Sequence, residues 1–529
     1  MFRRWLLAAC FFIVIAIAAA TWWWTPALWS LVIFGPLIFM TLHDSYQTKH
    51  AILRNFPVVG RLRYLFEMVR PEMQQYFIES NIDSFPIARE MRSVIYQRAK
   101  GDLETKAFGT QRDVYRVGYE WAAHALAEAE LLDQEPRILV GGPDCAKPYS
   151  SSRLNISAMS FGALSPTAIR ALNSGARIGN FAHNTGEGGV SPYHRAGGGD
   201  LVWQIGTAYF GCRTPDGGFD LHHFKDTAQD DQIRMIEIKL SQGAKPGHGG
   251  VLPACKVTPE IAKIRHVPVG LTVLSPPRHS TFSTPIGLLE YVAQLRELSG
   301  GKPVGFKICI GRRTEFLAIC KAMIQTGITP DFITIDGGEG GTGAAPLEFT
   351  NSIGMPARDA WAFAHSALVG VNLRDRVRVF GSGKILTGFH MIRAMALGVD
   401  ACNSARGMML ALGCIQALRC NHDTCPTGVA TQNPALYKAL VFPDKAQRVA
   451  KFHKGTIESF LELLGAMGLS DPHNISPEML YRRAGDMCVR SYDELYDFLE
   501  PGQLLDGADA PESWKNDWRR SQADSFTSV

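Results

Sequence analysis

The sequence predicts an α/β protein built on a parallel (β/α)8 barrel, the TIM-barrel architecture, preceded by a transmembrane helical hairpin and a helical N-terminal extension. Short β-rich runs alternate with longer amphipathic runs from Arg153 onward, a pattern typical of repeated βα units. Glycine-rich loops follow several of the predicted strands. A length of 529 residues fits one barrel of this class with appended segments.

The composition narrows the classes of function. Hydrophobic residues make up 46% and charged residues 20% of the chain, as in a globular protein. A net charge of +4 over this length gives no basis for a polyanion partner, so we expect no nucleic-acid binding. Eleven cysteines are too sparse for a disulfide scaffold. The chain is therefore expected to work in a reducing compartment.

Two apolar stretches at the N-terminus, residues 5–20 and 27–42, are each near the length that crosses a bilayer. Trp22 to Trp24 and Pro26 suit an interfacial turn between them, so residues 1–45 are predicted to form a transmembrane hairpin. Basic residues flank both outer ends (Arg3, Arg4, Lys49, Arg54, Arg61 and Arg63). The positive-inside rule then predicts a two-helix protein of the inner (cytoplasmic) membrane with its catalytic domain in the cytoplasm. A cleaved signal peptide is the alternative, but it leaves the second stretch unexplained.

Three further regions follow the hairpin. Residues 46–150 are predicted to be a mainly helical extension, with helices near residues 61–70, 86–100 and 115–132. Residues 151–432 are predicted to form the barrel. Residues 433–529 are predicted to be a C-terminal helical segment and tail, with one clear helix at 445–464.

Eight strands are predicted from apolar, β-branched runs, at residues 154–158, 181–184, 235–240, 269–274, 304–310, 332–336, 377–380 and 400–403. Helices are expected between the later members, at residues 286–298, 315–325 and 387–397. Eight successive units favour a closed barrel over an open sheet. In such barrels the chemistry lies at the C-terminal strand ends, and the loops after the last two strands are the usual phosphate site.

The predicted strand ends carry patterned glycine loops, including Asp336-Gly337-Gly338 and Gly381-Ser382-Gly383. Glycine allows backbone N–H groups to approach an anion or a flat ring closely. An ordinary tight turn explains any one such loop. Five of them at strand ends instead indicate a ligand site.

Cys414, Cys420 and Cys425 follow the eighth predicted strand, and their spacing lets three thiolates face one centre. Zinc normally has four ligands and would need His422 or an outside group, whereas a three-iron cluster needs only three thiolates. The alternative is buried free thiols. That is the role expected for three other cysteines (Cys10, Cys309 and Cys402).

Residues 153–432 resemble the FMN-binding synthase domain of the glutamate synthase family. The resemblance is carried by residues 184–189 (Asn-Thr-Gly-Glu-Gly-Gly), 242–253, 274–277, 336–343 and 414–432. It implies that Cys414, Cys420 and Cys425 bind a 3Fe-4S cluster. It also implies FMN over the barrel mouth, contacted by Ala158, Met159, Ser160, Gln204, Lys307, Asp336, Gly337 and Gly338, with its phosphate near Gly381, Ser382, Gly383, Ala405 and Arg406. A cation such as Lys307 beside the flavin's N1 and O2 stabilises the anionic reduced ring.

The same resemblance implies that Lys245 and Arg265 bind 2-oxoglutarate. Glu187 and Lys245 are the candidate catalytic residues, although a carboxylate at position 187 is equally suited to hydrogen-bonding the glycine loop. Two polar substrate contacts of the family are replaced here by Val190 and Val251. The identity of the substrate is therefore left open.

The chain resembles the shorter, stand-alone members of the family, in which a synthase domain occurs without a glutaminase domain. The first hypothesis is reductive amination of 2-oxoglutarate, or a related 2-oxo acid, to glutamate. Because no Rossmann fingerprint is found, a ferredoxin or a reductase subunit is the expected electron donor. The second is a flavin-dependent amino acid or amine oxidoreductase with another substrate. The third is a non-enzymatic membrane electron-transfer or sensing subunit.

Overall fold

The computed structural model describes all residues except 1, 83, 106, 507–508 and 528–529. The chain forms two compact units, Met1–Arg89 and Glu90–Val529. The domain boundaries predicted after residues 45, 150 and 432 stay predictions.

The first unit is helical throughout its regular structure. Its elements are α1 (Phe2–Trp23), the 3-10 helix η1 (Thr25–Ser30), α2 (Leu31–Tyr46), α3 (Ala51–Asn55), α4 (Gly60–Met73) and the π-helical turn η2 (Gln74–Ile78). Phe2–Trp23 and Thr25–Tyr46 are long and apolar enough to cross a membrane, and both are almost wholly exposed. The predicted helical hairpin is confirmed as a pair of apolar helices joined by a short turn, on the criteria of length and composition.

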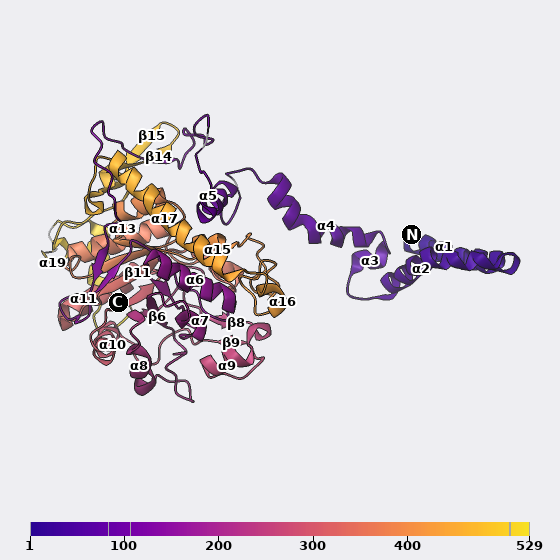
Figure 1. Ribbon diagram of the computed structural model, residues 1–529, viewed down its shortest axis with the longest axis horizontal. Helices are drawn as coiled ribbons and strands as arrows, with labels where there is room; N and C mark the ends of the chain where they lie inside the picture. The colour runs from indigo at the N-terminus through magenta and orange to yellow at the C-terminus, as the bar shows by residue number, and fades with distance from the viewer. Residues whose placement is uncertain (1, 83, 106, 507–508, 528–529) are drawn as a thin grey trace. The chain divides into compact units, whose positions relative to one another are not determined.

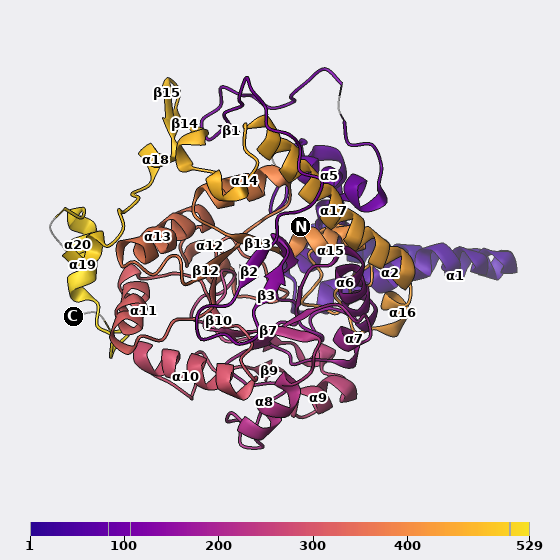
Figure 2. The same ribbon diagram turned by 60° about the vertical axis from the view of Figure 1, so that its left-hand side comes forward.

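The second unit is built around a closed eight-stranded parallel barrel. Figures 1 and 2 show its strands in the interior of the unit, with helices around them. In chain order its strands are β4 (Leu154–Ile156), β5 (His183–Asn184), β6 (Leu201–Ile205), β7 (Ile233–Lys239), β10 (Val304–Ile308), β11 (Phe332–Asp336), β12 (Arg378–Ser382) and β13 (Ala401–Ser404). β13 pairs with β4 in parallel and closes the ring. The predicted fold class is confirmed.

One predicted strand is wrong and one strand was missed. Residues 269–274 contribute only β9 (Val273–Leu274), which pairs with β8 (Val251–Leu252) in a hairpin outside the barrel. Val269 and Leu271 there are more than half exposed, so this apolar run does not enter the core. The true third strand is β6, in which every residue is buried. It was missed because only the four-residue helix α7 (Pro192–Arg195) separates it from β5, which breaks the expected alternation of strands and long helices.

The barrel is surrounded by helices, several of which begin at a side-chain cap. The long ones are α6 (Pro166–Gly179), α8 (Leu221–Ala228), α10 (Pro285–Leu298), α11 (Arg313–Thr326), α13 (Ala357–Gly370) and α14 (Gly388–Ala396), with the shorter α9 (Pro259–Arg265), α12 (Leu347–Ser352) and α15 (Arg406–Leu412). Ser165, Thr284 and Thr387 each accept a hydrogen bond from a backbone N–H of the first turn, which satisfies a donor that the helix leaves unpaired. The helices predicted at 286–298, 315–325 and 387–397 correspond to α10, α11 and α14.

The C-terminal part packs against the barrel through α17 (Phe442–Ala466), which contains the helix predicted at 445–464. α17 lies along α6, and a Cβ at Gly175 would come within 2.7 Å of the Val449 side chain. Glycine at this position therefore lets the two helix backbones approach closely. The remaining elements are α5 (Arg89–Lys100), α16 (Pro434–Tyr437), η3 (Ala254–Lys256), η4 (Pro472–Asn474), η5 (Pro477–Met479), α18 (Tyr492–Leu495), α19 (Gln503–Asp506) and α20 (Glu512–Arg520).

The helix predicted at residues 115–132 is wrong. This segment contains β1 (Glu120–Ala122), which joins β14 (Leu480–Gly485) and β15 (Cys488–Ser491) in a three-stranded antiparallel sheet. The buried Glu120 carboxylate pairs with Arg358 and Arg393. These long-range ion pairs hold the segment extended, and local sequence carries no trace of them.

One end of the barrel is closed by a hairpin of β2 (Ile138–Val140) and β3 (Tyr149–Ser151). Ile138, Val140 and Tyr149 form a buried cluster with barrel residues such as Phe332 and Phe380. Because Phe332 and Arg378 are the first residues of β11 and β12, this plug covers the N-terminal ends of the strands. The C-terminal ends are left for the site.

Candidate active site

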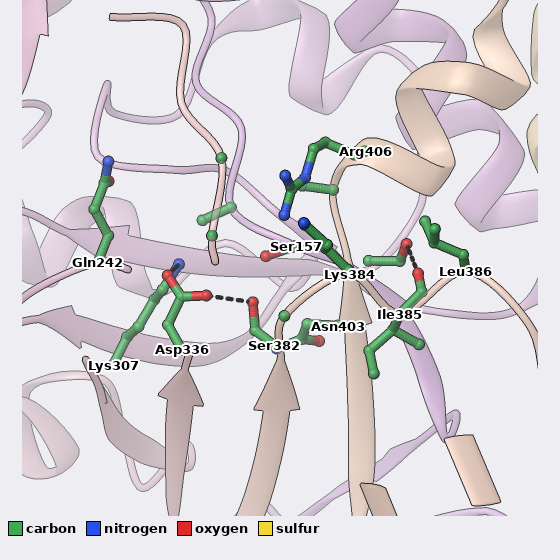
Figure 3. Close-up of a pocket in the computed structure, with 16 residues that line it drawn as sticks. Ser157, Gln242, Lys307, Asp336, Ser382, Lys384, Ile385, Leu386, Asn403 and Arg406 are labelled. Carbon is green, nitrogen blue, oxygen red and sulfur yellow. Dashed lines mark hydrogen bonds and ion pairs between the residues drawn. The ribbon is translucent and has the colours of Figure 1, made fainter. Parts of the chain in front are cut away.

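A pocket opens at the C-terminal ends of the barrel strands, and Figure 3 shows the residues that line it. Its empty volume is about 490 Å³, which includes space open to solvent. The lining residues lie at the C-terminal ends of β10, β11, β12 and β13, in the loops after β4, β7, β11, β12 and β13, and at the start of α15: Ser157, Ala158, Gln242, Lys307, Asp336, Gly340, Gly341, Ser382, Gly383, Lys384, Ile385, Leu386, Asn403, Ser404, Ala405 and Arg406. The pocket therefore occupies the region where barrels of this kind carry their chemistry.

Lys307 and Asp336 form a buried ion pair on one side of this pocket, with 3.1 Å between Nζ and Oδ2 (Figure 3). The Asp336 carboxylate also accepts hydrogen bonds from Ser382 Oγ at 2.7 Å and from the Gly243 backbone N–H at 2.9 Å. Burial alone would lower the pKa of Lys307, but the Asp336 carboxylate reverses this and the pKa is raised. The protonated Lys307 side chain therefore brings a stable positive charge to this side of the pocket.

Arg406 and Lys384 bring two more cations to the opposite side of the pocket, next to Gly383 (Figure 3). Arg406 donates from Nη2 to the Glu339 backbone oxygen at 2.6 Å, which fixes the guanidinium. Burial lowers the pKa of Lys384, and the nearby Arg406 adds to the effect. Two neighbouring cations beside the backbone of Gly383 are suited to binding a phosphate group.

These donors fit FMN in chemistry: a buried cation for the electron-rich edge of the ring and two cations for the phosphate. Of the predicted FMN residues, Ala158, Lys307, Asp336, Ser382, Gly383, Ala405 and Arg406 line the pocket. Met159, Ser160, Gln204, Gly337, Gly338 and Gly381 are outside its lining, and their cofactor roles stay predictions.

Gln204 belongs instead to a polar cluster inside the barrel. The buried carboxylate of Glu237 accepts hydrogen bonds from Gln204 Nε2 at 2.6 Å, Asn184 Nδ2 at 2.8 Å and Thr334 Oγ1 at 2.6 Å. Every oxygen of this carboxylate has a partner, as a charge in the barrel interior requires. The cluster places a fixed negative charge near Lys307 and helps to keep that lysine protonated.

A second group of charges lies beside the pocket, around the loops after β5 and β7. Glu187 pairs with Lys239 at 2.9 Å between Oε1 and Nζ. Lys245 and Arg265 are close enough to Glu187 to act on its carboxylate electrostatically. One carboxylate among three cations leaves a net charge of +2 when all four groups are ionised, which suits a substrate with two carboxylates.

Burial and mutual repulsion set the ionisation of this group. Burial would raise the pKa of Glu187, but Lys239 outweighs it and the pKa is lowered, so the carboxylate is ionised at neutral pH. Burial lowers the pKa of Lys245 to about 8, and Lys239 contributes to the shift. Burial likewise lowers the pKa of Arg265 to about 10. Of Lys245 and Arg265, Lys245 is therefore the one that titrates nearer to neutral pH.

Arg265 lies against the loop that follows β4. Its Nη2 donates to the Phe161 backbone oxygen at 2.9 Å and to Ser160 Oγ at 3.3 Å, while its buried Nε has no hydrogen-bond partner. A Cβ at Gly188 would lie 2.7 Å from Nη2, so only glycine leaves room for this guanidinium. An unpaired buried donor is costly, so this guanidinium is held at the site at an energetic cost.

Sequence reasoning missed Lys239 and Lys384 as site residues. Lys239 is the last residue of β7, inside a predicted strand, so its position at the C-terminal end of a barrel strand was the available signal. Lys384 directly follows the predicted glycine loop after β12. Neither carries a local pattern that separates it from an ordinary surface lysine.

The three clustered cysteines lie in the loop after α15. Cys425 is buried, and Cys414 and Cys420 are partly exposed. Burial is the main cause that raises the pKa of the Cys414 thiol to about 12. The nearby thiols of Cys420 and Cys425 add to this shift. Within the described parts of the chain, no group of three or more His, Cys, Asp and Glu side chains could hold a metal ion as it stands. Cys10, Cys309 and Cys402, expected to be buried free thiols, are buried and free.

Of the three thiols, Cys425 is the one whose surroundings favour the thiolate form. Burial would raise the pKa of its thiol, but hydrogen bonds from Thr427 and from the backbone N–H groups of Ala430, Thr427 and Val429 lower it. The buried Lys256 lies nearby and donates to the Ala430 and Ala163 backbone oxygens at 2.8 and 3.0 Å. These contacts tie the cysteine loop to the loop after β4.

Comparison with known proteins gives one family. The family model described as a conserved region in glutamate synthase matches residues 112–470. The glutamate synthase large subunit-like protein YerD of Bacillus subtilis (strain 168) is 36% identical over 494 residues, covering 86% of this chain and 94% of that protein. The archaeal-type glutamate synthase (NADPH) of Thermotoga neapolitana is 34% identical over 318 residues, covering 59% of each chain.

Among solved structures, a mutant flavocytochrome b2 with pyruvate bound aligns over 82% of this chain and 91% of its own, with 11% identity and a TM-score of 0.41. The chain spans about three fifths of the archaeal-type relative and nearly all of the Bacillus protein. The family model and the Bacillus relative show that the chain belongs to the glutamate synthase family.

Proposed function

We propose that this protein is a membrane-anchored FMN and iron–sulfur oxidoreductase that reductively aminates 2-oxoglutarate, or a related 2-oxo acid, to glutamate. Membership of the glutamate synthase family makes the chain an oxidoreductase. The observation that carries the substrate assignment is the net positive group of Glu187, Lys239, Lys245 and Arg265 beside the pocket. A dicarboxylate neutralises this group, and an uncharged substrate would leave it unbalanced.

The reaction needs ammonia, a 2-oxo acid, one hydride and one proton. Ammonia and the 2-oxo group lose water to form an imine, and addition of hydride to carbon and a proton to nitrogen gives the amino acid. FMN, when bound, supplies the hydride. The chain's own residues bind and orient the substrate through Lys245 and Arg265. The lowered pKa of Glu187 makes its carboxylate a weak base, so Lys245, whose pKa is lowered to about 8, is the better matched group for donating the proton to the imine nitrogen.

The pocket residues support FMN as the cofactor. Lys307 would contact the electron-rich edge of the ring, and Arg406 and Lys384, which also line the pocket, would contact the phosphate. We further propose a 3Fe-4S cluster on Cys414, Cys420 and Cys425, supported by three thiols on one loop and by the N–H groups around Cys425. The three thiols are not grouped for a metal in the described structure, so this part of the proposal rests on the family resemblance of the cysteine segment.

The two apolar helices support anchoring of the protein in the cytoplasmic membrane, with the catalytic unit on the cytoplasmic side. Reducing equivalents are proposed to come from a ferredoxin or a reductase subunit, because the sequence has no fingerprint for a dinucleotide of its own.

A second function is favoured by one observation. Val190 and Val251 stand where the family has polar substrate contacts, and Val251 is committed to the β8–β9 hairpin. An amino acid or amine with an apolar side chain, oxidised by the flavin, fits these residues better than 2-oxoglutarate does. If the substrate is an amino acid, the same positive group would bind its single carboxylate.

The deciding experiment is anaerobic. The detergent-solubilised full-length protein is assayed for flavin, iron and sulfide, reduced chemically, and mixed with 2-oxoglutarate and ammonium while its flavin absorbance is followed. Rapid reoxidation with stoichiometric glutamate is the expected result. Arg265→Met should abolish it, while Lys263→Met, which changes an exposed cation on the same helix α9, should leave it intact. Two results together would refute the first function in favour of the second. The chemically reduced flavin would stay reduced after 2-oxoglutarate and ammonium are added, and the oxidised flavin would become reduced when an amino acid is added.

A further inference from the structure

Helix α4 (Gly60–Met73) presents an apolar stripe that the described residues of its own unit leave exposed. The stripe consists of Leu62, Leu65, Phe66, Val69 and Met73, at positions i, i+3, i+4, i+7 and i+11 of the helix. This spacing puts all five on one face. Their exposed fractions run from 37% for Val69 to 65% for Phe66. A stripe of this kind needs an apolar partner.

The start of α4 is tied to the end of the second candidate span. Asp44, in the last turn of α2, is fully buried. Its Oδ2 accepts hydrogen bonds from the Val58 N–H at 3.1 Å and from Arg61 Nε at 2.9 Å, and its Oδ1 accepts from Arg61 Nη2 at 2.6 Å. Arg61 lies in the first turn of α4. The helix therefore starts at the level where the span Thr25–Tyr46 ends.

The charges around the stripe are mainly positive. On the helical wheel Arg63 and Arg70 border one edge of the stripe, and Arg61 and Glu72 border the other. Residues 49–73 contain five basic residues (Lys49, Arg54, Arg61, Arg63 and Arg70) and two acidic residues (Glu67 and Glu72), a difference of three positive charges. Basic side chains that flank an apolar face are the chemistry that recognises anionic lipid headgroups.

We propose that α4 lies in the plane of the cytoplasmic membrane surface, with its apolar stripe in the boundary between headgroups and acyl chains and with Arg63 and Arg70 on anionic phosphates. This rests on the proposed membrane anchoring, and it adds a second, in-plane contact that follows the spanning hairpin. A bilayer is favoured over a protein partner because the Asp44–Arg61 pair joins α4 directly to a span that is itself exposed and apolar.

The test is photocrosslinking in the full-length protein, reconstituted in nanodiscs that contain phosphatidylglycerol. A benzophenone amino acid replaces Phe66 on the stripe or, as the matched control, Glu67 on the adjacent polar face. The two positions are neighbours on one helix, and both side chains are exposed. After illumination, mass spectrometry distinguishes lipid adducts from peptide crosslinks. We expect lipid adducts from position 66 in clear excess over position 67.

Peptide crosslinks from position 66, to the barrel unit of the same chain or to a second copy, would overturn the proposal. Equal yields of lipid adducts at the two positions would overturn it as well. Carbonate extraction of native membranes separates this failure from failure of the anchor. If carbonate extracts the protein from the membrane, both the spanning hairpin and the membrane contact of α4 are wrong. If the protein resists carbonate but gives peptide crosslinks at position 66, only the membrane contact of α4 is wrong.

Discussion

Replacement of Lys245 by Met tests the charge group at the substrate site most directly. Lys245 carries one of three cations that surround Glu187, and its Nζ donates to the Ala344 backbone oxygen at 3.1 Å. Methionine keeps much of the side-chain volume and removes the charge. The net charge of the group falls from +2 to +1, so affinity for a dicarboxylate should fall while the fold is kept.

The size of the loss follows from one charged hydrogen bond, worth roughly 1.5–3 kcal/mol. At about 1.36 kcal/mol per tenfold change, Lys245→Met should weaken 2-oxoglutarate binding by roughly 10- to 150-fold. Isothermal titration calorimetry of the FMN-loaded protein in detergent gives this number directly. The matched control is Lys263→Met, which should bind 2-oxoglutarate like the unchanged protein because Lys263 is exposed on α9.

The pH dependence supplies an independent readout. The pKa of Lys245 is lowered to about 8, so the side chain is protonated below that pH and loses its charge as the pH rises through it. Affinity for 2-oxoglutarate in the unchanged protein should therefore be constant at lower pH and fall above about pH 8. Lys245→Met should bind weakly with no such fall, and Lys245→Arg should move the fall to higher pH. If Lys245→Met binds within about twofold of the unchanged protein, or keeps the same loss above pH 8, the assigned role of Lys245 is wrong.

Three further changes test the cofactor sites. Arg406→Ala should raise the dissociation constant for FMN by roughly 10- to 100-fold in a flavin fluorescence titration, because a charged contact to phosphate is lost; unchanged affinity would place the phosphate elsewhere. Cys420→Ser should leave the flavin content intact and reduce iron and acid-labile sulfide to background, and retention of both would rule this thiol out as a ligand. Asp336→Asn should destabilise the FMN-free protein towards denaturant by about 3–5 kcal/mol, because Lys307 is left as an unpaired buried cation. Adding Lys307→Met should recover part of that loss, and a double variant no more stable than Asp336→Asn would contradict the pairing.

The closed barrel could be predicted because its signals are local. Seven of the eight strand predictions overlap a barrel strand, since buried parallel strands appear as short apolar runs. β6 was not predicted because a helix of only four residues separates it from β5. Residues 269–274 were wrongly predicted as a barrel strand because an apolar stretch has the same sequence pattern in a core strand and in an exposed hairpin. The extended segment at β1 depends on Arg358 and Arg393, more than two hundred residues away.

The candidate site divides in the same way. The sequence by itself determined the glycine loops and the three clustered cysteines, because each is a short motif, and the family resemblance added Lys245, Arg265 and Lys307. Only the tertiary structure decided which charges meet. It paired Glu187 with Lys239, brought Lys384 beside Arg406 and left Arg265 Nε unsatisfied. Closure of the barrel brings strand ends that are far apart in sequence to one rim, and ion pairs between loops have no local pattern in the chain.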